Sequence, residues 1–215
     1  MLGCDCKVCC STDPRDSRGR ASVLLKWDGH CVVVDTGAEF RQQALRERLM
    51  GVDAVLYTHA HADHIHGIDD LRAFSLRRPE PIPLYAADST CVFLERTFRY
   101  IFSAPAGTPN IPRLQLRRVN GAFELLGRTV TPVPICHGGE TILGFRVGGL
   151  AYLTDCSGVP EGSMALLAGL ETLVIGALMP KPHEKHFSVG QALELVAKLR
   201  PRRALLTHIS HHLLH

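Results

Sequence analysis

Residues 58–67 carry five side chains that can ligate a metal ion within a stretch of ten residues. They read Thr-His-Ala-His-Ala-Asp-His-Ile-His-Gly and follow an apolar run, Ala54–Tyr57, that predicts a buried strand. Donors placed where a strand ends are typical of ligand sites in α/β proteins. Alternation lets His59 and His61 point to one side of an extended segment. Mixed imidazole and carboxylate donors suit zinc, manganese or iron, so this stretch predicts a metal site rather than a histidine-rich polar loop.

Later apolar segments also end at histidine or aspartate. His137, Asp155 and His208 each follow such a segment, and a loop after a further one holds His183 and His186. Segments with a period of 2 alternate with segments with a period of 3.6, which predicts sheets covered by helices. The sequence therefore predicts an α/β protein in which several donors lie at strand ends.

A second group of candidate ligands lies within residues 1–10. Cys4, Cys6 and Cys9 form a Cys-x-Cys-x2-Cys motif, and three thiolates this close suit a tetrahedral zinc that needs one more donor. Spacing alone would let Cys10 replace Cys9, and a thiol cluster without metal is the alternative. The other cysteines, which have apolar neighbours and are predicted to be buried, are Cys31, Cys91, Cys136 and Cys156.

Several elements can be predicted around these donors. Residues 21–35 read as a hairpin whose turn is Asp28-Gly29. Helices are predicted over residues 39–50, 65–78 and 188–199. Asp35 ends the second strand of the hairpin, where its carboxylate either orients the metal loop or caps the following turn.

Composition limits the classes of protein. A length of 215 residues suits one domain over residues 1–215, or a tight pair of similar halves. The formal net charge of +3 is too small to imply a nucleic-acid partner. No apolar run approaches the roughly 20 residues of a membrane span, and the first residues do not resemble a signal peptide. We therefore expect a cytoplasmic protein that does not associate with membranes.

The His-Ala-His-Ala-Asp-His motif followed by Ile-His-Gly-Ile-Asp-Asp resembles the signature of the metallo-β-lactamase fold hydrolases. Within that superfamily the chain is most similar to the PhnP-type phosphodiesterases, which open phosphoribosyl cyclic phosphates. The resemblance implies an α/β fold, an αβ/βα four-layer sandwich with two mixed sheets flanked by helices. Relatives usually begin with a strand before the cysteine cluster, so we expect the N-terminal strand to be missing here. Pairing in a homodimer would cover the resulting sheet edge.

The resemblance also implies metal ligands. It places two divalent ions, zinc or manganese, in the active site and one structural zinc elsewhere. The residues implied for the first ion are His59, His61 and His137. Those implied for the second are Asp63, His64 and His208, with Asp155 bridging both. Those implied for the structural zinc are Cys4, Cys6, Cys9 and His211.

This equipment is expected to cleave a phosphodiester, a small cyclic phosphate, by metal-bound hydroxide. By resemblance the catalytic residues are Asp63 and His186, the latter as general acid, with His183 as a second candidate or a phosphate contact. His66 is expected to be a neighbour of the site and not a ligand. The alternatives are a tRNA 3′-processing nuclease, whose usual basic arm is not evident here, and a non-catalytic zinc-stabilised scaffold. The expected partner is therefore a small-molecule phosphodiester and not a nucleic acid.

Overall fold

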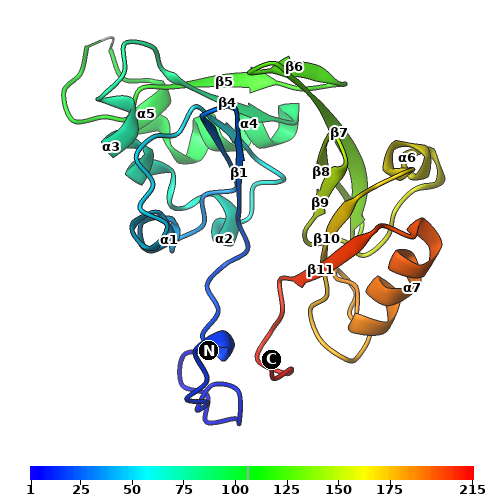
Figure 1. Ribbon diagram of the computed structural model, residues 1–215. Helices are drawn as coiled ribbons and strands as arrows, with labels where there is room; N and C mark the ends of the chain where they lie inside the picture. The colour runs from blue at the N-terminus through cyan, green and yellow to red at the C-terminus, as the bar shows by residue number, and fades with distance from the viewer. Residues whose placement is uncertain (106) are drawn as a thin grey trace. The chain divides into compact units, whose positions relative to one another are not determined.

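The computed structural model describes residues 1–105 and 107–215, which divide into two compact units (Figure 1). The internal unit is Arg20–Gly121, and the terminal unit combines Met1–Gly19 with Ala122–His215. Each unit contains one mixed sheet with helices packed on it, which confirms the predicted pair of mixed sheets flanked by helices. The single domain over residues 1–215 stays a prediction beside this division.

The internal unit has a five-stranded sheet in the order β1-β2-β3-β4-β5. Its strands are β1 (Val23–Trp27), β2 (His30–Val34), β3 (Ala54–Leu56), β4 (Ile82–Ala86) and β5 (Leu114–Arg118). The first two strands are antiparallel and the other neighbours are parallel. Trp27 pairs with His30, and both turn residues between them have positive φ, +47° at Asp28 and +82° at Gly29. This turn confirms the predicted hairpin, because two-residue turns of this hand match the twist of the strands.

The helices of the internal unit are short. They are α1 (Phe40–Arg46), α2 (Ala62–Ile65), η2 (Ile68–Leu71), α3 (Arg72–Ser75), α4 (Asp88–Thr97) and α5 (Arg99–Phe102). Phe40, Ile65 and Leu94 from three of these helices pack against Val55 and Leu84 of the sheet in one buried cluster. The core therefore fixes α2, which carries two of the candidate ligands.

The predicted helix over residues 65–78 is wrong as a single element. The chain leaves helical geometry around Gly67, whose N–H donates to the carbonyl of Thr36 at 2.7 Å. A Cβ at this position would lie 2.3 Å from the carbonyl oxygen of Gly37, so only glycine fits the close approach. The predicted helix over residues 39–50 is also too long, because it ends at Arg46 and Arg48 adopts a φ of +49°.

The terminal unit has a six-stranded sheet in the order β11-β10-β9-β8-β7-β6. Its strands are β6 (Phe123–Leu125), β7 (Arg128–His137), β8 (Glu140–Val147), β9 (Leu150–Leu153), β10 (Thr172–Gly176) and β11 (Arg203–Thr207). Strands β9, β10 and β11 are parallel, and β7 runs in the same direction because two antiparallel pairings separate it from β9. The carboxyl ends of these four strands therefore meet at one edge of the sheet.

The helices of this unit are η1 (Pro14–Asp16), α6 (Glu161–Met164), η3 (Ala165–Leu167) and α7 (Val189–Leu199). Helix α7 confirms the prediction for residues 188–199, and Ser188 caps it in a reciprocal pair with Gln191. Ala192 of α7 packs in one buried cluster with Leu173 and Ile175 of β10. Over residues 1–105 and 107–215, every helix is too short or too polar to span a bilayer.

Candidate metal centres

The internal unit brings together the four donors predicted from the main motif. Nε2 of His59 lies 2.9 Å from Nδ1 of His61, and Nε2 of His64 lies 3.3 Å from Oδ2 of Asp63. The rings of His59 and His64 are 4.3 Å apart. Both rings are buried, whereas His61 and Asp63 are partly exposed. Asp63 and His64 do not lie in a loop but on helix α2, which turns them toward the two strand-end histidines.

Asp35 is fully buried and orients two of these histidines. Its Oδ2 accepts from Nδ1 of His64 at 2.7 Å and from the hydroxyl of Thr58 at 2.8 Å, and its Oδ1 accepts from the N–H of Thr58 at 2.9 Å. Because the Thr58 hydroxyl donates to Asp35, it accepts from Nδ1 of His59 at 3.0 Å. Both histidines thus present Nε2 as the ligating atom. Burial raises the pKa of Asp35, and the hydrogen bonds from His64 and Thr58 oppose that shift.

The Asp35-Thr36-Gly37 segment also supports α2 through its backbone. The N–H of Thr36 donates to the carbonyl of His64 at 2.7 Å. A Cβ at Gly37 would lie 2.1 Å from the carbonyl oxygen of Asp63, so the segment touches the ligand helix directly. Of the two roles considered for Asp35, the contacts favour orientation of the metal loop.

The terminal unit brings together its own donors at the shared strand edge. His137 ends β7, Asp155 follows β9 and His208 follows β11. Nε2 of His208 lies 3.3 Å from Oδ1 of Asp155, and one ligand atom each from His137, Asp155 and His186 lie within 4.8 Å of one another. Asp155 and His208 have φ values of +52° and +55°. Such strained backbone at strand ends is typical of functional sites.

Backbone carbonyls fix the ring of His137. Its Nδ1 donates to the carbonyl of Asp155 at 2.8 Å and to that of Lys185 at 3.0 Å, so Nε2 is the ligating atom. The hydroxyl of Thr154 donates to Oδ1 of Asp155 at 2.7 Å. These supporting contacts were not predicted from the sequence. A threonine directly before a donor recurs in the sequence, as Thr58-His59 and Thr154-Asp155, and this pattern is the signal for the two threonine hydroxyl contacts.

The two candidate proton-transfer residues differ in their surroundings. The ring of His186 stacks on that of His208 at 4.9 Å and 13°, and its Nδ1 lies 3.8 Å from Oδ2 of Asp155. Burial lowers the pKa of His186 to about 4, while Asp155 acts in the opposite direction. His183 is exposed, and its ring lies 5.1 Å from that of His186. The structure thus places His186 at the donor edge and His183 on its outer side.

Two other residues considered from the sequence join no ligand group of the described residues. His66 is exposed and packs its ring edge-to-face on Phe98 at 5.9 Å. Burial raises the pKa of Cys156 to about 12, which keeps it as a thiol. The expectation that His66 is a neighbour of the site and not a ligand stays a prediction.

The donor spacings fit divalent metal ions. Tetrahedral zinc with bonds of about 2.0–2.2 Å to nitrogen and oxygen places neighbouring donor atoms about 3.4 Å apart. The His64–Asp63 and His208–Asp155 spacings are both 3.3 Å. With a zinc–sulfur bond of about 2.3 Å, a sulfur and a nitrogen lie about 3.5 Å apart. The spacings therefore satisfy this geometry within each unit, except that the 2.9 Å between Nε2 of His59 and Nδ1 of His61 is shorter than it requires.

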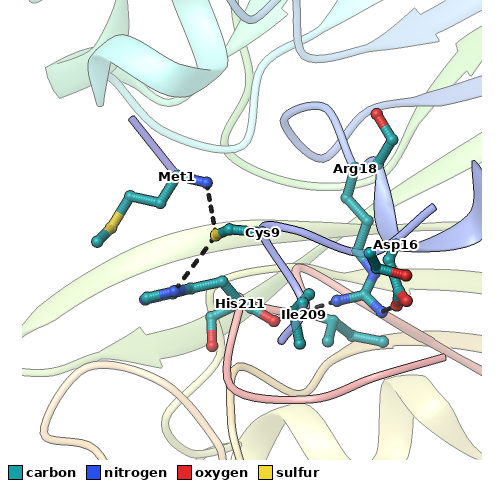
Figure 2. A pocket seen from close by; sticks show the side chains of 10 residues that line it. Met1, Cys9, Asp16, Arg18, Ile209 and His211 are labelled. Carbon is teal, nitrogen blue, oxygen red and sulfur yellow. Dashed lines mark hydrogen bonds and ion pairs between the residues drawn. The ribbon is translucent and has the colours of Figure 1, made fainter. Parts of the chain in front are cut away.

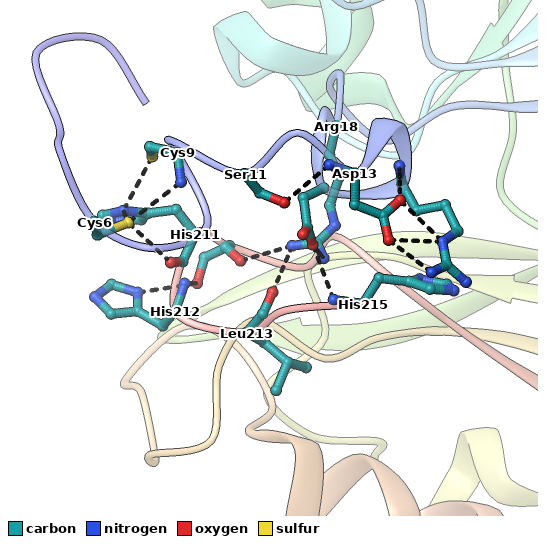
Figure 3. Close-up of polar contacts among 12 residues, drawn as sticks. Cys6, Cys9, Ser11, Asp13, Arg18, His211, His212, Leu213 and His215 are labelled. Carbon is teal, nitrogen blue, oxygen red and sulfur yellow. Dashed lines mark hydrogen bonds and ion pairs between the residues drawn. The ribbon is translucent and has the colours of Figure 1, made fainter.

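The cysteine cluster lies in the terminal unit, where the two ends of the chain meet. Sγ of Cys4, Cys6 and Cys9 lies 3.3, 3.4 and 3.6 Å from Nδ1 of His211. Figure 2 shows Cys9 facing His211, and Figure 3 shows Cys6 beside the same ring. Hydrogen bonds from the Cys9 backbone and from His211 lower the pKa of Cys6 to about 6, which favours the thiolate. Cys10 is exposed and outside this group, so Cys9 is the better third thiolate.

A family model described as a beta-lactamase superfamily domain matches residues 30–209. The chain belongs to this superfamily. A solved structure of a protein described as a new diphosphatase from the PhnP family is 43% identical, with a TM-score of 0.94, and the match covers all of this chain and 82% of that one. The similarity confirms the resemblance to PhnP-type proteins within the beta-lactamase superfamily.

Two curated relatives of this superfamily member bear different names. An octanoyltransferase of Porphyromonas gingivalis is 34% identical over 98% of this chain and 43% of its own length. A ribonuclease Z of Mycobacterium bovis is 27% identical over 75% of this chain and 65% of its own length. The chain spans less than two thirds of each relative, so neither name describes this chain by itself.

Proposed function

We propose that this protein is a metal-dependent hydrolase that cleaves a small anionic phosphodiester. The observation that carries the proposal is the orientation of His64 and His137, whose Nδ1 atoms are both committed to protein acceptors so that Nε2 can bind a cation. The 43% identity to a PhnP-family diphosphatase supports phosphorus as the reacting centre. Small phosphodiesters carry the negative charge that a cationic centre attracts.

The proposed centre holds two divalent ions, zinc or manganese. Its proposed ligands are His59, His61 and His137 for one ion and Asp63, His64 and His208 for the other, with Asp155 shared. When bound, such ions lower the pKa of a coordinated water to about 7 and offset the charge of the phosphoryl oxygens. The protein itself orients these ligands through Asp35, Thr58 and the carbonyl of Lys185.

We assign His186 to the proton that the departing alkoxide needs. Its ring is mostly buried at the donor edge, where an anionic phosphate beside it would favour the protonated form. His183 lies on the exposed side of that ring and is proposed as a phosphate contact or as a second proton donor. Asp63 is proposed both to bind metal and to orient the attacking water through its carboxylate.

A reducing compartment suits this protein. The cysteines of the described residues are all free, and cytosolic conditions keep thiols reduced. We therefore propose a cytoplasmic enzyme whose partner is a small-molecule substrate. A homodimer stays a prediction, which sedimentation of the purified chain would test.

The test uses purified protein loaded with Mn²⁺ or Zn²⁺ and a panel of four substrates. They are bis-nitrophenyl phosphate, a five-membered cyclic ribose phosphate, a dinucleoside diphosphate and a precursor tRNA. We expect turnover of the first two and the loss of most of it in Asp155→Ala, because that carboxylate is proposed to serve both ions. A wild-type rate in Asp155→Ala would contradict the proposed centre.

The other two substrates test two alternative functions that the related proteins suggest. Preferential cleavage of the dinucleoside diphosphate would point to a diphosphatase activity like that named for the PhnP-family neighbour. Preferential cleavage of the precursor tRNA would point to the ribonuclease Z relatives. An absence of turnover on all four, with metal bound, would leave the scaffold hypothesis and contradict the proposal.

A further inference from the structure

The cysteine cluster and His211 lie on two segments that have little regular structure. Residues 1–19 contain the single turn η1, and residues 208–215 form neither helix nor strand. Neither buried apolar cluster of the described residues includes a member of these segments. A cavity of about 470 Å³ borders both segments, and its lining includes Cys9, Ile209 and His211 (Figure 2). Apolar packing therefore contributes little to holding His211 beside the thiols, and polar contacts must do so.

The two sides of the site differ in how they are ordered. The thiols are arranged locally, since the carbonyl of Cys6 accepts from the N–H of Cys10 at 3.0 Å and Sγ of Cys6 accepts from the N–H of Cys9 at 3.5 Å. The imidazole of His211 comes from the far end of the chain. It reaches the thiols only when the segment that carries it is docked on residues 1–19.

Arg18 docks that segment on both sides of His211. Its Nη1 donates at 3.1 Å to the carbonyl of Ser210, which belongs to the peptide bond that leads into His211. The same nitrogen donates to the carbonyl of Leu213 at 2.8 Å. The N–H of Ser210 is also held, by the carbonyl of Leu178 at 2.8 Å. Beyond His211, however, the described hydrogen bonds from the rest of the chain come from Arg18 and its neighbour Asp16.

Asp16 holds the guanidinium and extends the bridge to the last residue. Its Oδ1 accepts from Nη2 of Arg18 at 2.9 Å and from the N–H of His215 at 2.9 Å. The side chains of Arg18 and Asp16 are 21% and 4% exposed, so this ion pair is shielded from water and stronger than an ordinary surface pair. Figure 3 shows these contacts beside the cysteine cluster.

We propose that Arg18, held by Asp16, is a positioning residue that places His211 as the fourth ligand of the cysteine-bound zinc. The pair docks the two chain ends without any metal, so the imidazole is in place before an ion binds. A ligand that is already ordered binds more tightly, because the ordering cost does not weaken the binding step. The cysteine site shares no ligand with the proposed phosphodiester-cleaving centre, so the two can be tested separately.

The experiment titrates the purified full chain with Co²⁺ under reducing conditions and then displaces the Co²⁺ with Zn²⁺. Thiolate-bound cobalt absorbs through charge transfer from sulfur, and no other ligand group of the described residues contains cysteine, so this band reports the cluster alone. Loss of a group that orients a ligand typically lowers metal affinity by about 10–100-fold. Arg18 holds the backbone and not the ring, so we expect about 10-fold weaker binding of both ions in Arg18→Gln. Arg18→Lys keeps a cationic donor without the planar fork and should restore part of the affinity.

A double-mutant cycle with His211→Ala separates positioning from a general structural role. If Arg18 acts through His211, Arg18→Gln should cause little further loss of affinity in a chain that already lacks the imidazole. A purely structural role would lower the affinity by the same factor in both backgrounds. That result, or wild-type affinity in Arg18→Gln, would overturn the inference.

Arg15→Gln is the matched control, since Arg15 lies in the same segment, its side chain is 64% exposed and its ion pair is with Asp13. It should bind Co²⁺ and Zn²⁺ like the wild type, and a loss equal to that in Arg18→Gln would also overturn the inference. If Arg18→Gln does not fold, Asp16→Asn tests the same contacts and should lower the affinity by a smaller factor, whereas unchanged affinity there would contradict the proposal. A wild type that cleaves no phosphodiester would contradict the proposed function and leave this comparison intact.

Discussion

At the scale of single residues, hydrogen bonds to one ring nitrogen decide which nitrogen of a histidine can bind metal. Nδ1 of His64 donates to Asp35, and Nδ1 of His137 donates to two backbone carbonyls. Each contact leaves Nε2 as the ligating atom and fixes the ring plane, which lowers the cost of ordering the ligand. His186 differs, because its Nδ1 faces Asp155 at 3.8 Å, beyond hydrogen-bonding distance. The Nδ1 proton of His186 is therefore less firmly held than those of His64 and His137.

This difference leads to a prediction for His186→Ala. The loss of activity should be about 10²–10⁴-fold for a diester with an aliphatic leaving group, because an alkoxide needs a proton to depart. Nitrophenolate departs without one, so turnover of bis-nitrophenyl phosphate should fall much less. Steady-state kcat for the two substrates, measured at saturating metal, gives the comparison.

His183→Ala is the matched control, since it removes an imidazole three residues away on the exposed side. It should affect both substrates to a similar and smaller extent. A leaving-group dependence in His183→Ala and not in His186→Ala would transfer the proton-donor role to His183. Equal losses on both substrates in His186→Ala would argue against any such role.

At the scale of elements, the sequence predicts where donors appear better than what supports them. Apolar runs that end in His59, His137, Asp155 and His208 are visible in the sequence, and the strands that precede them confirm that pattern. The breaks in the helices were not predicted, because a period of 3.6 continues through Gly67 while a tertiary contact with Thr36 decides the geometry there. Local pattern cannot show a contact between residues 31 positions apart.

The contact at Gly67 supports a prediction about the junction between α2 and η2. Gly67→Ala would place a Cβ 2.3 Å from the carbonyl oxygen of Gly37 and 2.7 Å from Cβ of Phe40. The backbone must shift, so we expect a loss of about 1–3 kcal/mol in the free energy of unfolding. Denaturant unfolding of the metal-free protein measures this loss of stability. The metal affinity of the main motif, residues 58–67, should fall as well.

Gly162→Ala is the control for this substitution. Gly162 lies in α6, and nothing lies within 4 Å of a Cβ built there. Alanine in an unstrained helical position should leave stability unchanged or raise it by about 0.4–1 kcal/mol. Similar destabilisation by both substitutions would show that the close approach at Gly67 does not decide the geometry of the junction.

At the scale of the whole molecule, the two ends of the chain belong to the same unit although they are far apart in sequence. The terminal unit joins residues 1–19 to residues 122–215, and Figure 1 shows both ends of the chain near one another within it. Cys4, Cys6 and Cys9 contact His211 across more than 200 positions, so closing this long loop is entropically costly. A metal at the cluster would offset that cost. The resemblance predicted His211 as the fourth ligand of this metal, whereas the local sequence pattern alone supplied only the three cysteines.

The cysteine cluster is expected to be separable from the active site. Cys6→Ala should lower zinc stoichiometry by one ion per chain and reduce the melting temperature, because the metal then no longer links the two ends of the chain. Cys6 belongs to none of the other ligand groups of the described residues, so the active-site ions and phosphodiester turnover should remain near wild-type values. Elemental analysis and thermal unfolding of Cys6→Ala, with Cys10→Ala as the exposed control, measure both effects. Unchanged zinc content in Cys6→Ala would refute the assignment, whereas parallel loss of all ions would show that the cluster and the active site form one cooperative unit.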